Sequence, residues 1–507
     1  MKRSYVNTAC ITALLASVSI GCSSAGPNAT TGGNKGGETG SKDKLALNIM
    51  TISYEGGGWP EKHPVVEFLN QKFNVDLKIQ WIPNDNYKEK LGVYAASNEF
   101  PDAFIMRRDD YMKWRDKGVY MDVKPVIDKY PNLYKQLGGT EAFQYLNPPG
   151  KYFGLPYYSI ETRDSLGIRK DWLDKLGLKM PETIDELYEV LKAFTFRDPD
   201  GNGKNDTIGL SMSISENRRY NHIQPIEYAF GLANGWKLEG DKLVPWQAQL
   251  KELKDFAGFL RKAYAEGVLD KDFAVNKLKD PQYKFDSGKT GITSIVPTTM
   301  AYTVIPSLKK IDPKAELAQL PPPAGPNGSR GTITNPGDQK VVINGKINKD
   351  KQERLLEIMN YLVSDEGNIL AKNGIEGVHY TKKDGNKFEK TEAFDKERPF
   401  LLSTWLIRRV DPNIQVRLWD DQEVVKMTNK WFEVNAKYRY PNQGAAFDSE
   451  TAIKTGASLD QKLVETMTNI IIGSQPLDAL DQAVEKWKKD GGDKIIAEIN
   501  EQYMKSK

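Results

Sequence analysis

Hydrophobic residues follow two alternating patterns from Leu45 onward. Short runs rich in apolar residues alternate with longer segments in which apolar residues recur every three or four positions. The first pattern predicts buried strands, and the second predicts amphipathic helices. The first five expected elements alternate strand, helix, strand, helix and strand, at 45–53, 61–73, 75–81, 87–96 and 101–106. This order predicts an α/β protein with a mostly parallel sheet covered by helices.

The same alternation returns in the second half of the chain. The expected elements there are helices at 184–193 (with Thr183 as N-cap), 247–266 and 351–363, and a strand at 340–343. Residues 319–327 (QLPPPAGPN) form a Pro/Gly break of the kind found between elements or domains. A length of 507 residues suits two domains better than one simple core.

The N-terminus has the pattern of an exported protein. Two basic residues precede an uncharged stretch at 8–20 that is too short to span a bilayer and ends at Gly21–Cys22. Residues 23–44 are rich in Gly, Ser, Thr and Asn and have no apolar periodicity. We therefore expect a signal peptide at 1–21, a flexible tether at 22–44, and a soluble body outside the membrane.

The cysteine at the end of this signal resembles the lipidation site of bacterial lipoproteins. That resemblance implies a diacylglycerol on the Cys22 sulfur and an acyl chain, such as palmitate, on the new amino terminus, anchoring the chain to the extracellular face of the cell membrane. Ser19 departs from the usual Leu, so an ordinary signal peptide cut nearby is the alternative. The only other cysteine, Cys10, lies in the removed segment, so Cys22 has no intramolecular partner.

Composition excludes several function classes. With 71 basic and 68 acidic residues the chain is almost neutral, so no broad nucleic-acid-binding face is expected. Only three histidines are present, and the motifs HExxH, GxSxG and GxxxxGK[ST] are absent. A zinc enzyme or a Cys/His nucleophile is therefore not expected, and any ATPase must be a separate chain.

The most specific local motif is DPDGNGKND at 198–206. Oxygen-bearing side chains alternate with glycines, as in the first part of an EF-hand calcium loop. The expected calcium ligands are the side chains of Asp198, Asp200, Asn202 and Asp206 and the carbonyl of Lys204. The twelfth position is Gly209 instead of Glu, and residues 207–214 read as a strand. The alternative is a plain Asx/Gly turn stabilised by its own side-chain hydrogen bonds.

Several longer segments resemble one protein family from about residue 45 to the C-terminus. They are FPDAFI (100–105), YFGLPYY (152–158), residues 168–194, EGVLDKDF (266–273), SGKTGI (287–292), NYLVSDEGN (360–368) and NGIEGVHY (373–380). The chain resembles the family 1 extracellular solute-binding proteins of ABC importers, in the branch of large LplA-like and alginate-oligosaccharide-binding lipoproteins. Relatives in the alginate-binding branch use such a loop as a structural calcium site, with an acid where this chain has Thr207.

The resemblance implies a type II periplasmic-binding-protein-like fold. Two α/β lobes would enclose the ligand in a cleft, one lobe formed by 45–158 plus 325–395 and the other by 159–324 plus 396–507. The protein would be a monomer that captures an oligosaccharide and delivers it to a membrane permease. There are two alternatives. The protein could be a surface polysaccharide hydrolase or lyase, or the same fold could bind a peptide or other solute.

Sugars present apolar ring faces and many hydroxyls, so their sites pair aromatic rings with charged and amide groups. Positions near expected strand ends supply the main candidate ligand contacts: Tyr54, Glu55, Trp59, Arg107, Tyr157, Tyr158 and Arg163. Weaker candidates are Arg218, Arg219, Tyr220, Trp236, Tyr302, Trp405 and Arg408. Most aromatic residues in a chain of this size are structural, so each is weighed against a place in the core.

Overall fold

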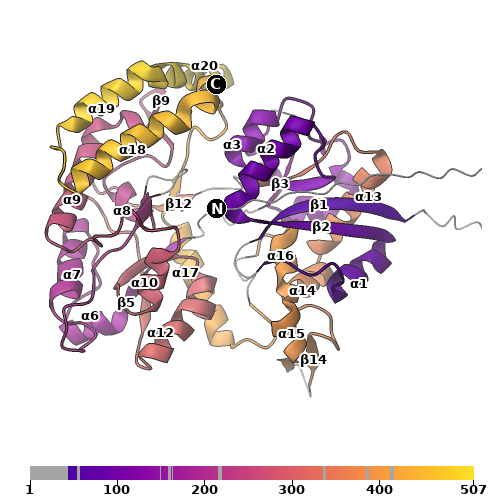
Figure 1. Ribbon diagram of the computed structural model, residues 1–507, viewed down its shortest axis with the longest axis horizontal. Coiled ribbons are helices and arrows are strands. Elements are labelled where there is room, and N and C mark those ends of the chain that lie inside the picture. The colour runs from indigo at the N-terminus through magenta and orange to yellow at the C-terminus, as the bar shows by residue number, and fades with distance from the viewer. Residues whose placement is uncertain are drawn as a thin grey trace, which may run out of the picture. The chain divides into compact units, whose positions relative to one another are not determined.

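The computed structural model describes residues 44–507, with gaps at 54–56, 149, 158–161, 163, 215–219, 335–338, 384–386 and 412–415 (Figure 1). Most of its buried apolar residues belong to two large clusters. The first draws on residues 47–157 and 341–407, and the second on 166–320 and 463–484. We call the parts built around them the first and second lobes. The predicted α/β fold with two lobes is confirmed, whereas the predicted lobe boundaries stay a prediction.

The first lobe is built on a five-stranded sheet of order β2-β1-β3-β13-β4. Its strands are β1 (Leu45–Ser53), β2 (Val75–Pro83), β3 (Ala103–Arg107), β13 (Gln339–Ile343) and β4 (Leu155–Pro156). Helices lie on both sides of the sheet (Figure 1). The helices of this lobe are α1 (Pro64–Phe73), α2 (Tyr87–Ser97), α3 (Arg108–Trp114), α4 (Pro131–Gln136), α5 (Gly139–Gln144), α13 (Lys349–Leu362), α14 (Asp365–Asn373), α15 (Glu392–Glu397) and α16 (Leu402–Trp405).

Local sequence explains the first of these helices. The imidazole of His63 caps α1 by accepting the backbone N–H of Val65, and the helix ends at Asn74 in the left-handed conformation. Val65 and Leu69 lie one turn apart and are fully buried, so the apolar stripe of α1 faces the sheet.

The five opening elements were predicted correctly, with boundaries off by up to three residues.

The second lobe contains a three-stranded antiparallel sheet of order β10-β5-β11. Its strands are β5 (Ser165–Arg169), β10 (Ile292–Ile295) and β11 (Leu317–Leu320), and β8 (Trp236–Glu239) and β9 (Lys242–Pro245) form a hairpin. The helices named below are α7 (Ile184–Phe196), α9 (Leu250–Ala265), the π-helical turn η4 (Met300–Val304), α17 (Gln422–Ala436), α18 (Ala457–Ile471), α19 (Ala479–Trp487) and α20 (Asp493–Ser506). Thr183 caps α7 as predicted, in a capping box with Glu186.

Two predictions about strands need correction. The sheets are less parallel than expected, because β13 runs antiparallel to β3 and the second-lobe sheet is antiparallel. The chain re-enters the first lobe at the edge where β3 ends, so β13 has to run back from that edge. The strand predicted at 207–214 is mostly absent, since Ile208 and Leu210 form only isolated bridges and regular pairing is limited to Ser213–Ile214.

The C-terminal helices complete the second lobe. The amide of Asn500 on α20 bonds both backbone groups of Leu243 in β9, at 2.8 and 2.9 Å. Leu463 and Met467 on α18 are buried in the second-lobe core. Within the described part of the chain, no helix is both long enough and apolar enough to cross a membrane.

Candidate ligand-binding site

Four strands of the first-lobe sheet begin or end along one edge. β1 ends at Ser53 and β3 at Arg107, and Gln339 at the start of β13 pairs with Arg107. Tyr157, directly after β4, donates its backbone N–H to the Gln339 carbonyl at 3.1 Å. Open α/β sheets bind ligands outside the carboxyl ends of their strands, so this edge, here called the ligand edge, is the candidate site.

Arg107 and Tyr157, both predicted as contacts, lie at the ligand edge. Arg107 is half-buried, and its Nη2 donates to Asn84 Oδ1 at 2.6 Å. Tyr157 is buried, and the guanidinium carbon of Arg408 lies 5.5 Å from its ring centroid, a cation–π distance. The ligand edge therefore places the Arg408 guanidinium beside an aromatic ring, with the Arg107 guanidinium at the end of β3.

Trp405 is fully buried in the first-lobe core. Its backbone carbonyl accepts a hydrogen bond from the Thr51 hydroxyl, two residues before β1 ends. Its indole nitrogen has no hydrogen-bond partner among the described residues, which is uncommon for a buried N–H group. Packing holds Trp405 next to the ligand edge, and contact with a ligand stays a prediction.

Trp59 lies in the loop after β1 and belongs to the buried first-lobe cluster. Contact with a ligand stays a prediction. The ring of Trp59 stacks on His63 with 4.3 Å between centroids and 8° between planes, and its indole N–H donates to the Arg398 carbonyl at 3.0 Å. His63 in turn lies 6.3 Å from the ring of His379. Trp59 therefore joins the loop after β1 to the segment that follows α15.

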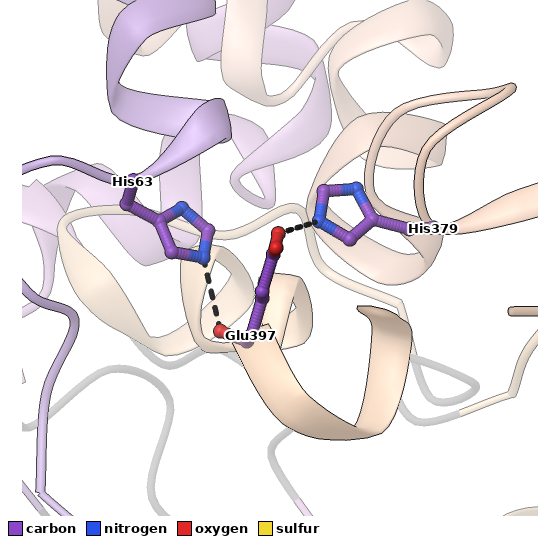
Figure 2. Close-up of side chains that lie close together, drawn as sticks. All are labelled: His63, His379 and Glu397. Carbon is purple, nitrogen blue, oxygen red and sulfur yellow. Dashed lines mark hydrogen bonds and ion pairs between the residues drawn. The ribbon is translucent and has the colours of Figure 1, made fainter. Parts of the chain in front are cut away.

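The two histidines meet around Glu397 (Figure 2). His63 Nε2 lies 2.9 Å from the Glu397 carbonyl oxygen, and His379 Nε2 lies 3.0 Å from its carboxylate. The opposite nitrogens accept backbone N–H groups, His63 Nδ1 from Val65 at 3.2 Å and His379 Nδ1 from Ile375 at 2.9 Å. A backbone N–H can only donate, so each Nδ1 carries the lone pair and each Nε2 carries the hydrogen.

This tautomer decides what the histidine cluster can do. His63, His379 and Glu397 have metal-ligating atoms within 4.8 Å of one another. However, both Nε2 atoms direct a hydrogen, instead of a lone pair, toward Glu397. Metal binding would require moving that hydrogen to Nδ1, where it would oppose a backbone N–H. The cluster therefore fits a neutral hydrogen-bonded clamp better than a metal site.

Acid is expected to destabilise this clamp. Burial lowers the pKa of both His63 and His379. This effect outweighs that of Glu397, which raises the pKa of both histidines, and that of Glu67, which raises the pKa of His63. Below about pH 6.5 the histidines of the unfolded chain become protonated, whereas those of the folded chain stay neutral. The clamp therefore contributes its whole stabilisation above that pH, and this contribution is lost as the pH falls toward the folded pKa. Urea unfolding between pH 7.5 and 5 should show this loss.

The matched variant is His379→Gln, which cannot titrate. It should be less stable than the parent at pH 7.5, but its free energy of unfolding should fall less between pH 7.5 and 5. Equal falls in parent and variant would contradict the assignment of the acid sensitivity to this cluster.

Buried amides position the second-lobe strands where the chain crosses between lobes. Asn435 on α17 accepts hydrogen bonds from Ser165 Oγ at 2.9 Å and Gln319 Nε2 at 3.0 Å. Its own amide donates to the Thr162 carbonyl at 3.0 Å. Asn435 therefore ties together β5, β11 and the first crossing segment. Neither Asn435 nor the histidine cluster was predicted, because their partners are distant in sequence.

The remaining described candidates lie in the second lobe. Tyr302 is half-buried in η4, and burial together with Asp420 raises its pKa above the usual range. Trp236 is half-buried at the start of β8 against Gly444, where a Cβ would lie 2.6 Å from the indole ring. Tyr220 is fully buried. Their roles in binding stay predictions.

Several predicted residues lie outside the described residues. They are Cys22, Tyr54, Glu55, Tyr158, Arg163, Arg218 and Arg219. Lipidation at Cys22 and ligand contacts at the other positions therefore stay predictions.

The acidic loop at 198–206 folds around Asn202. The Asn202 amide donates to Asp200 at 2.8 Å and to Asp206 at 3.0 Å. Asp198, at φ +43°, accepts backbone N–H groups from Gly201, Asn202 and Gly203 at 3.0–3.1 Å. Burial opposes ionisation of Asp198, but these donors lower its pKa overall, whereas burial raises the pKa of Asp200. Three carboxylates and one amide oxygen are thus gathered in one short loop.

Two features after the loop explain its departure from an EF-hand. The Thr207 hydroxyl donates to the Phe194 carbonyl at 2.8 Å, joining the chain to α7. A Cβ at Gly209 would lie 2.4 Å from the Leu191 carbonyl oxygen, so no glutamate fits at the twelfth position. The hard oxygen donors still suit calcium, although Lys289, 2.7 Å from Asp206, competes with a cation there.

A model of one protein family, the bacterial extracellular solute-binding proteins, matches residues 61–369. Lipoprotein LipO of Bacillus subtilis (strain 168) is 30% identical over 494 residues, covering 92% of this chain and 94% of LipO. The chain belongs to the bacterial extracellular solute-binding proteins.

Two further comparisons extend the similarity of this solute-binding protein. The polygalacturonan/rhamnogalacturonan-binding protein YtcQ of Bacillus subtilis (strain 168) is 27% identical over 497 residues, covering 95% of this chain and 96% of YtcQ. A crystal structure of the alginate-binding protein AlgQ2 without calcium ion superposes with a TM-score of 0.68 and 20% identity, over 91% of this chain and 98% of AlgQ2. The second likeness concerns the fold alone.

Proposed function

We propose that this chain is the substrate-binding lipoprotein of an ABC importer, which captures an oligosaccharide between its lobes and delivers it to a membrane permease. The observation that carries the proposal is the grouping of Arg107, Tyr157 and Arg408 at the ligand edge of a solute-binding protein. Aromatic rings pack against the apolar faces of sugars, and guanidinium groups donate to hydroxyls and carboxylates. YtcQ, similar over nearly the whole chain, is a polysaccharide-binding protein.

The mechanism is closure of the lobes over the ligand. The chain passes from one core to the other between Tyr157 and Leu166, between Leu320 and Val341, and after Ile407. A few residues in such connections can absorb a hinge rotation. The closed form is favoured only by the contacts that the ligand makes in it and not in the open form. No covalent step is involved, and the ligand is released unchanged.

The cellular setting follows from the same assignment. Cys22 would carry the lipid anchor on the extracellular face of the cell membrane, and residues 23–44 would supply the reach to the permease. The ATPase is a separate chain, and the protein acts as a monomer. The similarity to LipO, which is itself a lipoprotein, supports the anchor.

Calcium is the proposed structural ion of the loop at 198–206. Asp198, Asp200, Asn202, Asp206 and the Lys204 carbonyl would hold it, and it would neutralise their charge. The loop connects α7 to a segment that bridges Thr290 and Leu269, so the ion would stabilise the second lobe. The crystal structure of AlgQ2 without calcium ion supports the proposal that a calcium ion in this fold can be removed.

Ligand-dependent thermal unfolding tests the proposed function. A panel of neutral and acidic oligosaccharides should contain a class that stabilises the protein by about 2.7 kcal/mol at one hundred times its dissociation constant. Chromatography should recover that sugar intact. A cleaved sugar would point to a hydrolase or lyase, and stabilisation by peptides alone would move the function to another solute.

A further inference from the structure

An ion pair joins the two lobes beside the ligand edge. Arg115 follows α3, which begins directly after β3 ends at Arg107. Its Nη2 lies 2.8 Å from Asp448 Oδ2. Asp448 precedes α18 and is held by α20, both of the second lobe. Arg108 adds a weaker contact nearby, from Nη2 to the Ala445 carbonyl at 3.3 Å. We call the Arg115–Asp448 contact the interlobe ion pair.

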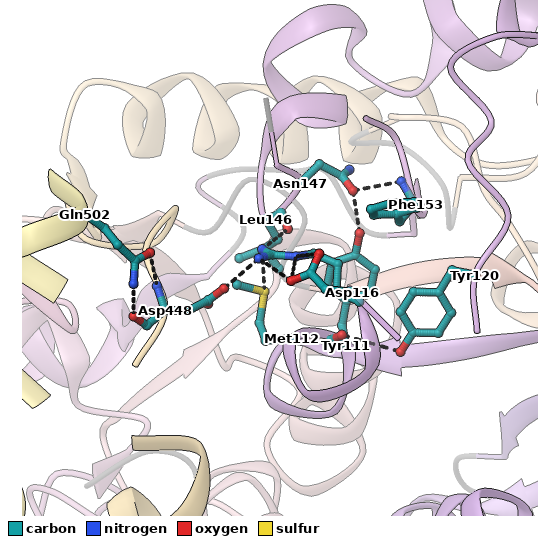
Figure 3. Close-up of polar contacts among 10 residues, drawn as sticks. Tyr111, Met112, Asp116, Tyr120, Leu146, Asn147, Phe153, Asp448 and Gln502 are labelled. Carbon is teal, nitrogen blue, oxygen red and sulfur yellow. Dashed lines mark hydrogen bonds and ion pairs between the residues drawn. The ribbon is translucent and has the colours of Figure 1, made fainter. Parts of the chain in front are cut away.

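The first lobe holds the guanidinium in place (Figure 3). Arg115 Nη1 donates to the Leu146 carbonyl at 3.1 Å, and Nε and Nη2 bond Asp116 at 3.0–3.3 Å. Leu146 has φ +64°, an unfavourable value for leucine, and Asn147 beside it bonds Tyr111 and Phe153. The Arg115 side chain is only 11% exposed, so it meets Asp448 already oriented.

The second lobe holds the carboxylate equally firmly. Gln502 on α20 bonds both backbone groups of Asp448, accepting its N–H at 3.2 Å and donating to its carbonyl at 2.5 Å (Figure 3). Glu498, one turn earlier on α20, accepts from the hydroxyl of Ser449 at 2.5 Å and that of Thr451 at 2.8 Å. These contacts leave the Asp448 side chain, 20% exposed, directed toward Arg115.

We propose that the interlobe ion pair sets the balance between open and closed lobes, and thereby the ligand affinity. Exposed ion pairs contribute little to stability. Here both side chains are mostly buried and already oriented before they meet, so forming the pair costs little side-chain entropy. Opening the lobes would break the bond and return the two charges to water. The link to affinity rests on the proposed function, since a ligand that needs closed lobes binds in proportion to the closed fraction.

Substitution D448N tests the ion pair with little change of shape. Gln502 holds Asp448 only through backbone atoms, so asparagine can occupy the same position without the charge. The matched control is E450Q, which removes an exposed carboxylate two residues from Asp448 whose partner, Lys454, lies in the same lobe. The mature chain carrying Cys22→Ser would be spin-labelled at Val93→Cys and Met504→Cys, exposed positions on α2 and α20, and the label distances measured by pulsed EPR without sugar.

D448N should raise the ratio of open to closed populations about tenfold, and E450Q should leave it within about twofold. Identical distance distributions in the parent and D448N would overturn the proposal. If D448N folds poorly, Arg115→Lys provides the second variant. It should open the lobes by a smaller factor, because a positive charge remains opposite Asp448 but lysine lacks the planar group that contacts Leu146, Asp116 and Asp448 together.

The distance measurement needs no ligand, so its outcome is independent of the proposed function. Failure of every oligosaccharide to stabilise the protein would refute sugar capture and leave the EPR result standing. Once a ligand is known, D448N should weaken its affinity by about the factor by which it lowers the closed fraction, whereas E450Q should not.

Discussion

Replacement of Trp405 by alanine is expected to lower the free energy of unfolding by about 3–5 kcal/mol, the usual cost of removing a large aromatic side chain from a core. Trp405 is fully buried, and its backbone accepts the Thr51 hydroxyl, so the first-lobe core cannot close easily over the cavity. Urea unfolding of the purified chain would measure the loss.

Two further variants make the Trp405 experiment specific. Val93→Ala removes an apolar side chain of the same lobe that is 57% exposed, and should change stability by less than about 0.5 kcal/mol. Trp405→Phe keeps a buried ring and should cost clearly less than alanine. If Trp405→Ala left stability unchanged but abolished sugar binding, Trp405 would be a ligand contact and not a core residue.

Removal of calcium is expected to have the second large effect. If calcium is present at one thousand times its dissociation constant, binding adds about 4 kcal/mol to the folded state, and a chelator should remove that stabilisation. The melting temperature of the parent should therefore fall on chelation and recover on addition of calcium. Calorimetric titration would give the stoichiometry, expected to be one ion per chain.

Asp200→Asn is the informative variant of the loop at 198–206. It removes one carboxylate while leaving Asp198 to accept its three backbone N–H groups, so the turn itself should persist. This variant should respond weakly to chelator, whereas Asp241→Asn, at an exposed acid in the β8–β9 turn, should respond like the parent. If chelation leaves the parent's melting temperature unchanged, the loop is a plain Asx/Gly turn.

Much of the fold was predictable from local pattern. The helix at 184–196 has a cap at Thr183 and an apolar face of its own, so both its start and its buried side are contained in adjacent residues. The direction of β13 was not predictable in this way. It depends on the chain leaving the first lobe at Tyr157 and returning through Gln339 at the same edge, after it has built most of the second lobe.

The candidate site divides in a similar way. Arg107 was predicted because it follows an expected strand, and Tyr157 because the chain was expected to cross between the lobes there; both lie at the ligand edge. Trp59 followed a strand as well, but its stacking on His63 depends on partners more than 300 residues away in sequence. Local pattern predicts where in the fold a residue lies, whereas the burial of its side chain depends on which distant segments of the chain pack over it.

The sequence by itself determined the α/β alternation, the helix caps and the order of oxygen donors in the loop at 198–206, because each depends on residues within about a dozen positions. Tertiary structure alone decided the meeting of His63 with Glu397 and of Arg115 with Asp448. Those contacts join segments more than 300 residues apart. Their energies depend on distance and burial, which arise only when the cores of the lobes have formed.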